Sequence, residues 1–266
     1  MKKFILSICI GVILALTLTS CDVQVGVKPR NKTADKNSAI DKDETASLEG
    51  VEKININIEV ADALCKSSND NNVRLVVKNS TSFDGEVVMK KENENLNIKE
   101  NKSTKEIGSN RKNRKNRKIE IYIPREYKND ISLSNGVGDI KMEDVNGDNV
   151  SIGNGTGDMD ITKINVKELV INSGVGDTTL NLDKSPKNMK ISGGTGDCDI
   201  KIKEVNGDIT YSGGVGDLSI IVPENAPIKI KTSSGIGDRH IDAKVSEENK
   251  YTFNLDNGLG DIKVTN

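Results

Sequence analysis

The chain has 266 residues and a formal net charge of −2 at pH 7, and aromatic residues make up only 3% of it. Its 38 basic and 40 acidic residues create no overall positive field, so nucleic acid is not an expected partner. Four cysteines are too few for a disulfide framework, and the fold must therefore depend on hydrogen bonds and aliphatic packing.

Residues 1–20 are predicted to be a lipoprotein signal peptide. Lys2 and Lys3 precede an apolar stretch, residues 4–18, that is too short for a comfortable membrane span. The stretch ends in Leu-Thr-Ser-Cys, which resembles a bacterial lipobox. That resemblance implies cleavage before Cys21, lipid attachment to its thiol and retention on the outer face of the cell membrane. The alternative is an ordinary signal peptide with an incidental Cys21.

Residues 21–49 are predicted to be a lipid-anchored, disordered tether. They are rich in Lys, Asp, Asn, Ser and Thr and carry no periodic apolar pattern. A flexible segment of this length has an r.m.s. span of roughly 30 Å, which clears the lipid headgroups.

Residues 50–125 are predicted to form an N-terminal β-strand region, because apolar residues recur two apart at 54–60, 73–77, 96–98 and 119–123. A basic, asparagine-rich stretch separates the last two strands. It is a candidate anion-binding loop for lipid headgroups or wall phosphates, and the favoured alternative is a solvated hairpin loop. The cations of this loop are Arg111, Lys112, Arg114, Lys115, Arg117 and Lys118.

Residues 126–266 carry seven copies of a Gly-x-Gly-Asp turn. Successive aspartates are 19, 19, 20, 20, 21 and 23 residues apart, a period typical of stacked-coil repeat proteins. The glycines permit a tight corner where a Cβ would be costly. The turn residues are Gly136, Gly138, Asp139; Gly155, Gly157, Asp158; Gly174, Gly176, Asp177; Gly194, Gly196, Asp197; Gly214, Gly216, Asp217; Gly235, Gly237, Asp238; and Gly258, Gly260, Asp261.

Each repeat contains two short strands in which apolar and polar residues alternate. In the third repeat Leu169 and Ile171 precede the turn and Leu180 follows it, whereas Lys141 in the first repeat occupies a polar position. This pattern predicts an all-β, single-chain β-solenoid of about 20-residue coils with the N-terminal strands as a cap. We expect the residue between the two glycines to turn inward. These residues are Val137, Thr156, Val175, Thr195, Val215, Ile236 and Leu259.

The aspartates have two interpretations. Each could accept hydrogen bonds from backbone N–H groups of its own turn, or the row could bind Ca²⁺ by analogy with calcium β-rolls. The residue spacing differs from that of β-rolls, and like charges about 4.8 Å apart repel by only about 0.9 kcal/mol in water. The structural role is therefore favoured, and no metal or other cofactor is expected.

No catalytic constellation emerges from the sequence. His240 is the only histidine, and repeated aspartates without a paired acid or base are more often scaffold than machinery. Cys198 occupies an inward column and is expected to be a buried small hydrophobe. Arg239 interrupts the same column with a charge. The chain is therefore not expected to be an enzyme.

Three segments carry a resemblance to a known family: KIEIYIPREY, which ends at Tyr127, then ISLSNGVGDI, and later GGVGDLSIIVPENAPIKIKTSSGIGD. They resemble bacterial β-strand-repeat proteins called "putative adhesins", a domain of unknown function shared with Lia-type envelope-stress proteins. The resemblance covers residues 51–266. The chain lacks the helical regulatory module of some relatives.

We expect a membrane-tethered, non-enzymatic lipoprotein that serves as an adhesin-like or envelope-support module on the extracytoplasmic face. Its ligand is an unknown protein or envelope polymer. The alternative is an envelope-stress sensor or regulator that binds a partner protein or stress ligand. The strand after the seventh turn, residues 261–266, is expected to leave an unpaired edge that favours end-to-end homodimers.

Overall fold

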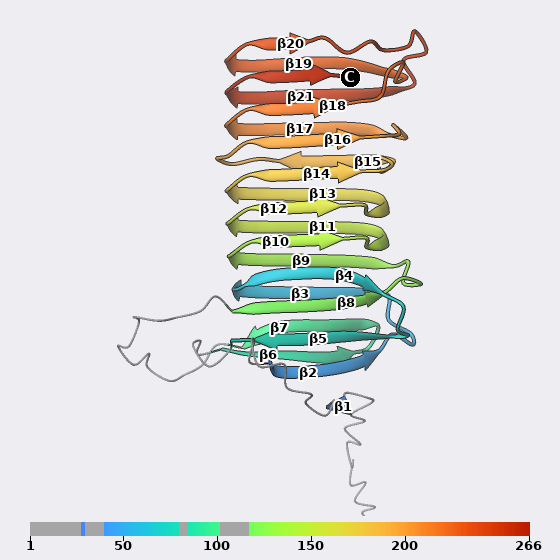
Figure 1. Ribbon diagram of the computed structural model, residues 1–266, viewed down its shortest axis with the longest axis vertical. Helices are drawn as coiled ribbons and strands as arrows, with labels where there is room; N and C mark the ends of the chain where they lie inside the picture. The colour runs from blue at the N-terminus through green and yellow to red at the C-terminus, as the bar shows by residue number, and fades with distance from the viewer. Residues whose placement is uncertain (1–27, 30–39, 80–84, 102–116) are drawn as a thin grey trace, which may run out of the picture.

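The computed structural model describes residues 28–29, 40–79, 85–101 and 117–266, which form a tall stack of β-strands (Figure 1). Two long sheets face each other across one core. None of these residues forms a helix that could cross a membrane. The predicted all-β solenoid is thus confirmed.

The first sheet contains one strand from every coil. In spatial order its strands are β1 (Lys28–Pro29), β2 (Ile40–Ser47), β5 (Asn72–Lys78), β8 (Lys118–Pro124), β4 (Asp62–Ser68), β10 (Ile140–Glu143), β12 (Met159–Thr162), β14 (Thr178–Leu182), β16 (Cys198–Ile202), β18 (Leu218–Ile221), β22 (Ile262–Thr265) and β20 (Arg239–Ile241).

The second sheet contains the other strand of each coil. Its spatial order is β19 (Ile228–Ile236), β21 (Tyr251–Leu259), β17 (Asp208–Val215), β15 (Asn188–Ser192), β13 (Asn165–Val175), β11 (Asn146–Thr156), β9 (Asp130–Val137), β3 (Lys53–Val60), β7 (Asn95–Asn101) and β6 (Glu86–Glu92).

Equivalent residues of successive coils stack directly, because neighbouring coils pair in parallel without a shift. Ile152 of β11 pairs with Leu133 of β9 and Ile171 of β13, and all three side chains are buried. Alternation along each strand sends these aliphatic side chains inward and the polar ones outward. The inward columns merge into one core that runs from Ala46 to Val264.

The N-terminal strands continue the solenoid. The coil β3–β4 lies directly against β9–β10, with Val60 paired to Val137 and Ala63 to Ile140. The coil β7–β8 lies beyond it, and the antiparallel strands β6, β5 and β2 cover that end. Residues 59–62, Glu-Val-Ala-Asp, therefore form an additional corner, which the glycine pattern did not reveal.

The prediction of a disordered tether up to residue 49 is wrong for residues 40–47, which form strand β2. This strand pairs antiparallel with β5. The strand is not apparent in the sequence because its residues are mostly polar. Cross-strand ion pairs stabilise it instead: the Arg74 guanidinium donates hydrogen bonds to both carboxylate oxygens of Asp43 at 2.8 Å.

The last two repeats exchange places. Strand β22 lies between β18 and β20, and β21 lies between β17 and β19. The prediction that residues 261–266 form the open edge is therefore wrong, because β22 is paired on both sides. The outermost coil is β19–β20, the sixth repeat. Arg239 belongs to this coil and is exposed, which explains how a charge is tolerated in an otherwise inward column.

Candidate functional site

The Gly-x-Gly-Asp corners stack so closely that neither glycine has room for a side chain. Gly157 has a φ of +130°, and a Cβ there would lie 2.3 Å from the carbonyl oxygen of Gly138 in the preceding coil. A Cβ on Gly155 would lie 2.5 Å from the carbonyl oxygen of Gly136. The motif is thus a requirement of coil-to-coil packing.

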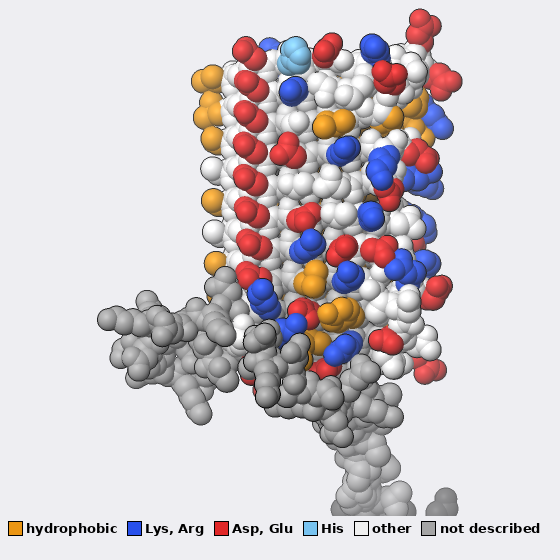
Figure 2. All heavy atoms as spheres, viewed as in Figure 1, with side chains coloured by type: hydrophobic (Ala, Val, Ile, Leu, Met, Phe, Trp, Pro, Cys, Tyr) orange, Lys and Arg blue, Asp and Glu red, His pale blue; other side chains and the backbone are white. Residues whose placement is uncertain are grey.

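The residue between the two glycines points outward, so the prediction that it turns inward is wrong. Val175 is 53% exposed and Ile236 is 72% exposed. Close stacking at the corner leaves this side chain only the solvent side. Together these residues make an apolar ridge: Val60, Val137, Thr156, Val175, Thr195, Val215, Leu259 and Ile236. Figure 2 shows its hydrophobic members as an orange column along one margin of the molecule.

A row of eight aspartates runs beside the ridge, and seven of the carboxylates accept a hydrogen bond from the neighbouring coil. Asp139 Oδ1 accepts a hydrogen bond from the backbone N–H of Asp158 at 3.0 Å, and Asp158 Oδ1 accepts one from Asp177 at 2.9 Å. The prediction that each carboxylate serves its own turn is therefore wrong. Figure 2 shows this carboxylate row in red. It consists of Asp62, Asp139, Asp158, Asp177, Asp197, Asp217, Asp261 and Asp238.

Asparagines occupy the inside of three corners. Asn154 Nδ2 donates to the carbonyl oxygens of Gly138 and Gly157, at 3.1 and 2.8 Å. Asn135 likewise donates to the carbonyl oxygens of Ala61 and Gly138, and Asn257 donates to that of Gly216. These buried amides thus satisfy carbonyl oxygens on the inside of the corner.

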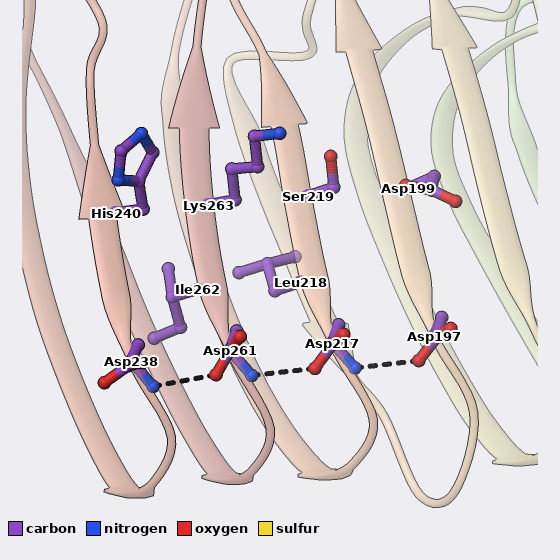
Figure 3. A pocket seen from close by; sticks show the side chains of 10 residues that line it. All are labelled: Asp197, Asp199, Asp217, Leu218, Ser219, Asp238, His240, Asp261, Ile262 and Lys263. Carbon is purple, nitrogen blue, oxygen red and sulfur yellow. Dashed lines mark hydrogen bonds between the residues drawn. The ribbon is translucent and has the colours of Figure 1, made fainter.

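An open depression lies beside the carboxylate row near the C-terminal end (Figure 3). His240, Lys263, Ser219 and Asp199 line it from neighbouring strands of the first sheet, and the aspartates of the row form its lower border. Within the described residues, no group of three or more His, Cys, Asp or Glu side chains is arranged to hold a metal ion.

The two described cysteines are not available as nucleophiles. Burial raises the pKa of the Cys65 thiol to about 12. Burial, with a smaller contribution from Asp199, likewise raises the pKa of the Cys198 thiol to about 12. Because the thiolate is the reactive form, both residues are inert packing elements at neutral pH.

Arg117 does not belong to an anion-binding loop, and its assignment to one is wrong. Its side chain is 0% exposed and pairs with the Glu100 carboxylate. Its Nη2 and Nη1 also donate to the carbonyl oxygens of Val60 and Gly85, both at 3.0 Å. Lys118 is exposed at the start of β8. Cys21, Arg111, Lys112, Arg114 and Lys115 lie outside the described residues.

The Glu100 carboxylate holds this corner together. Burial alone would raise its pKa, but hydrogen bonds from Arg117 and from the backbone N–H groups of Glu59 and Val60 lower the pKa overall. The N–H groups of Glu59 and Val60 donate to Glu100 Oε2 at 3.0 and 3.3 Å. A buried ion pair thus supports the corner at residues 59–62 from the neighbouring β7–β8 coil.

The fold and these surfaces define a β-solenoid in which eight corners each display one outward residue, apolar at six of them, and one carboxylate. The chain belongs to the family described as Toastrack DUF4097, whose model matches residues 51–266. No curated protein matches the chain.

Two solved structures are similar to this chain. A "putative adhesin" from Bacteroides fragilis is 20% identical, with 86% of this chain and 98% of that chain covered and a TM-score of 0.54. A "putative cell adhesion protein" from Clostridium sporogenes is 19% identical, with 84% and 98% covered and a TM-score of 0.41. At 20% identity the similarity to the Bacteroides fragilis structure concerns the fold alone.

Proposed function

We propose that the protein is a membrane-tethered, non-enzymatic binding module on the extracytoplasmic face of the cell envelope. Its ligand is a protein or an envelope polymer, which it holds on its repetitive lateral surface. The lipobox-like segment at Cys21 supports tethering, and the description of the Bacteroides fragilis structure as an adhesin agrees with surface binding.

The observation that carries this proposal is the apolar ridge. Soluble proteins rarely expose contiguous apolar side chains, and such patches commonly mark interaction sites. Here the side chains occupy eight successive coils about 4.8 Å apart, so the ridge extends roughly 34 Å. Glycine packing explains why the position must face outward, but it does not require Val, Ile or Leu there. Apolar residues at most of these positions therefore favour a binding role.

The carboxylate row restricts the chemistry of the ligand. It follows the ridge along its whole length and gives that margin a negative charge, as Figure 2 shows. An anionic polymer would be repelled at this margin. The ligand should therefore combine apolar groups with neutral or cationic ones.

Site-specific photo-crosslinking in intact cells tests the proposal. A photoreactive amino acid replaces Val175 on the ridge, and a matched variant carries it at Ser212, which is exposed on the outer face of β17. We expect a discrete adduct from position 175 and none from position 212. Equal labelling at both positions, or none at either, would contradict a ligand-binding ridge.

The identity of the adduct separates the two functions that the resemblance implies. A wall polymer or host surface protein would support adhesion or envelope support. A membrane kinase or stress protein would instead support a sensor or regulator.

A further inference from the structure

The two ends of the solenoid differ in how they are capped. At the N-terminal end the antiparallel strands β6, β5 and β2 cover the outermost coil. At the other end the coil β19–β20, here called the open coil, pairs with β21 and β22 on one side. Within the described residues no strand lies on its other side.

The open coil carries backbone groups that can bond to another strand. The N–H of Ile262 donates to the carbonyl oxygen of Asp238, and the N–H of Asp242 donates to that of Val264, both at 2.9 Å. Strand geometry alternates these directions, so the N–H and C=O groups of Arg239 and Ile241 face away from β22. Such an edge is a template for strand addition.

The same end exposes apolar side chains that belong to core columns elsewhere. Ile241 pairs with Val264, which is fully buried one coil further in, yet Ile241 is 42% exposed. Val245 is also exposed at this end, as is Ile236, which is the last member of the outward ridge and not of a core column. The core is therefore cut open at this end, and another coil of the same kind would cover it.

We propose that the open coil pairs with the open coil of a second copy, and that the resulting dimer joins two opposed surfaces. A two-fold axis brings identical strands together antiparallel. Pairing of β20 centred on Ile241 sets Ile241 against Ile241 of the second copy and His240 against Asp242 of the second copy. Aliphatic pairs, and pairs of a hydrogen-bond donor with a carboxylate, stabilise antiparallel strands when they lie directly opposite each other.

The position of the tether gives this dimer its function. Strands β1 and β2 lie at the end of the stack opposite the open coil (Figure 1). A two-fold axis across the stack points the two N-terminal ends in opposite directions. Nine stacked coils about 4.8 Å apart span roughly 40 Å, so the dimer separates its two outer ends by about 80 Å. Bridging rests on the proposed N-terminal membrane attachment.

Vesicle clustering tests this proposal on the full chain. The protein is attached to nickel-chelating vesicles through an N-terminal histidine tag, and clustering is followed by light scattering. The test variant is Ile241→Lys with Val245→Lys, at two exposed apolar sites of the open end that lie outside the ridge. Its control is Ile221→Lys, a lysine at a similarly exposed apolar site on the outer face of β18, also outside the ridge.

Wild type and Ile221→Lys should cluster vesicles, and the double variant should not. Sedimentation should show the dimer dissociation constant of the double variant raised at least about tenfold, because like charges then face each other. Ile241→Pro should act similarly, since it removes an outward N–H and no hydrogen bond to β22. Circular dichroism checks that each variant is folded.

Equal clustering by all variants would overturn the proposal, as would a wild-type chain that stays monomeric at high micromolar concentration. A dimer in sedimentation without vesicle clustering would overturn the bridging role. If vesicles still cluster but the photoreactive residue on the ridge gives no adduct, only the proposed ligand-binding function is contradicted. The two proposals therefore fail separately.

Discussion

Substitution of Gly157 by alanine should strongly destabilise the protein, whereas the same change at Gly153, four residues earlier, should not. At Gly157 the φ of +130° is essentially a glycine conformation, which costs an alanine about 1–3 kcal/mol. The new Cβ would also lie 2.3 Å from the Gly138 carbonyl oxygen. Pushing two coils apart adds an overpacking cost of about 1–3 kcal/mol. The expected total is about 2–6 kcal/mol.

Gly153 is a matched control because it lies in the same coil and a Cβ there has no neighbour within 4 Å. Alanine should leave stability unchanged or raise it by about 0.4–1 kcal/mol through the unfolded state. Urea unfolding followed by circular dichroism measures both free energies. If Gly157→Ala proves as stable as Gly153→Ala, the close-stacking account of the corner is refuted.

Four further outcomes can be measured on the same protein. Ile171→Asp should abolish folding in a thermal melt because it buries an unpaired charge, whereas Lys141→Asp on the outer face should cost about 0.5 kcal/mol. Asp177→Ala should cost a net of up to about 1.2 kcal/mol in urea unfolding, because the lost hydrogen bond of about 1.5–3 kcal/mol is offset by relief of repulsion from two neighbouring carboxylates at about 0.9 kcal/mol each. Asp177→Asn should cost less, since the amide oxygen can still accept the N–H of Asp197. Millimolar Ca²⁺ should leave the melting temperature nearly unchanged. A dedicated calcium site would instead stabilise the fold by about 2.7 kcal/mol when the Ca²⁺ concentration is a hundred times its Kd. The pKa of Glu100 is lower in the folded state than its usual 4.5. Its stabilising contribution is therefore complete above pH 4.5 and is lost as the pH falls through the folded value, so Glu100→Gln should flatten the acid limb of unfolding free energy against pH.

The sequence predicted the solenoid because period-2 alternation and the glycine period point to the same answer. The additional corner at Asp62 escaped notice because Glu59 and Ala61 replace its glycines. The apolar columns nevertheless identify it: Ile54 and Ile56 stand eight and six residues before Asp62, as Leu169 and Ile171 do before Asp177. The apolar columns therefore predict the corners of the solenoid better than the Gly-x-Gly-Asp motif does.

The exchange of the last two coils was hard to read from residue patterns, because both repeats carry the glycine turn and most of the same apolar columns. Arg239 was one signal, since a charge in an inward column suits the outermost coil, and connection length was a second. Two residues join β10 to β11, whereas residues 222–227 join β18 to β19 and residues 242–250 join β20 to β21. Only the longer connections can pass over an intervening coil.

The outward ridge was mispredicted because alternation was extended through the turn. Along a strand, side chains change sides at every residue. The corner breaks that rule: the glycines approach the preceding coil so closely that the inside is occupied by backbone and by side chains such as Asn154. Packing at the corner, rather than periodicity, decides where Val175 points.

The carboxylate row illustrates how an apparently costly arrangement can be stable. Neighbouring carboxylates about 4.8 Å apart repel by about 0.9 kcal/mol in water. A hydrogen bond to a charged acceptor contributes about 1.5–3 kcal/mol, and each coil gains one through Oδ1 of its neighbour, for example Asp177 to the N–H of Asp197. The hydrogen bonds therefore outweigh the repulsion without a bound cation. The uncompensated charge then lies beside the apolar ridge, where it can select against anionic ligands.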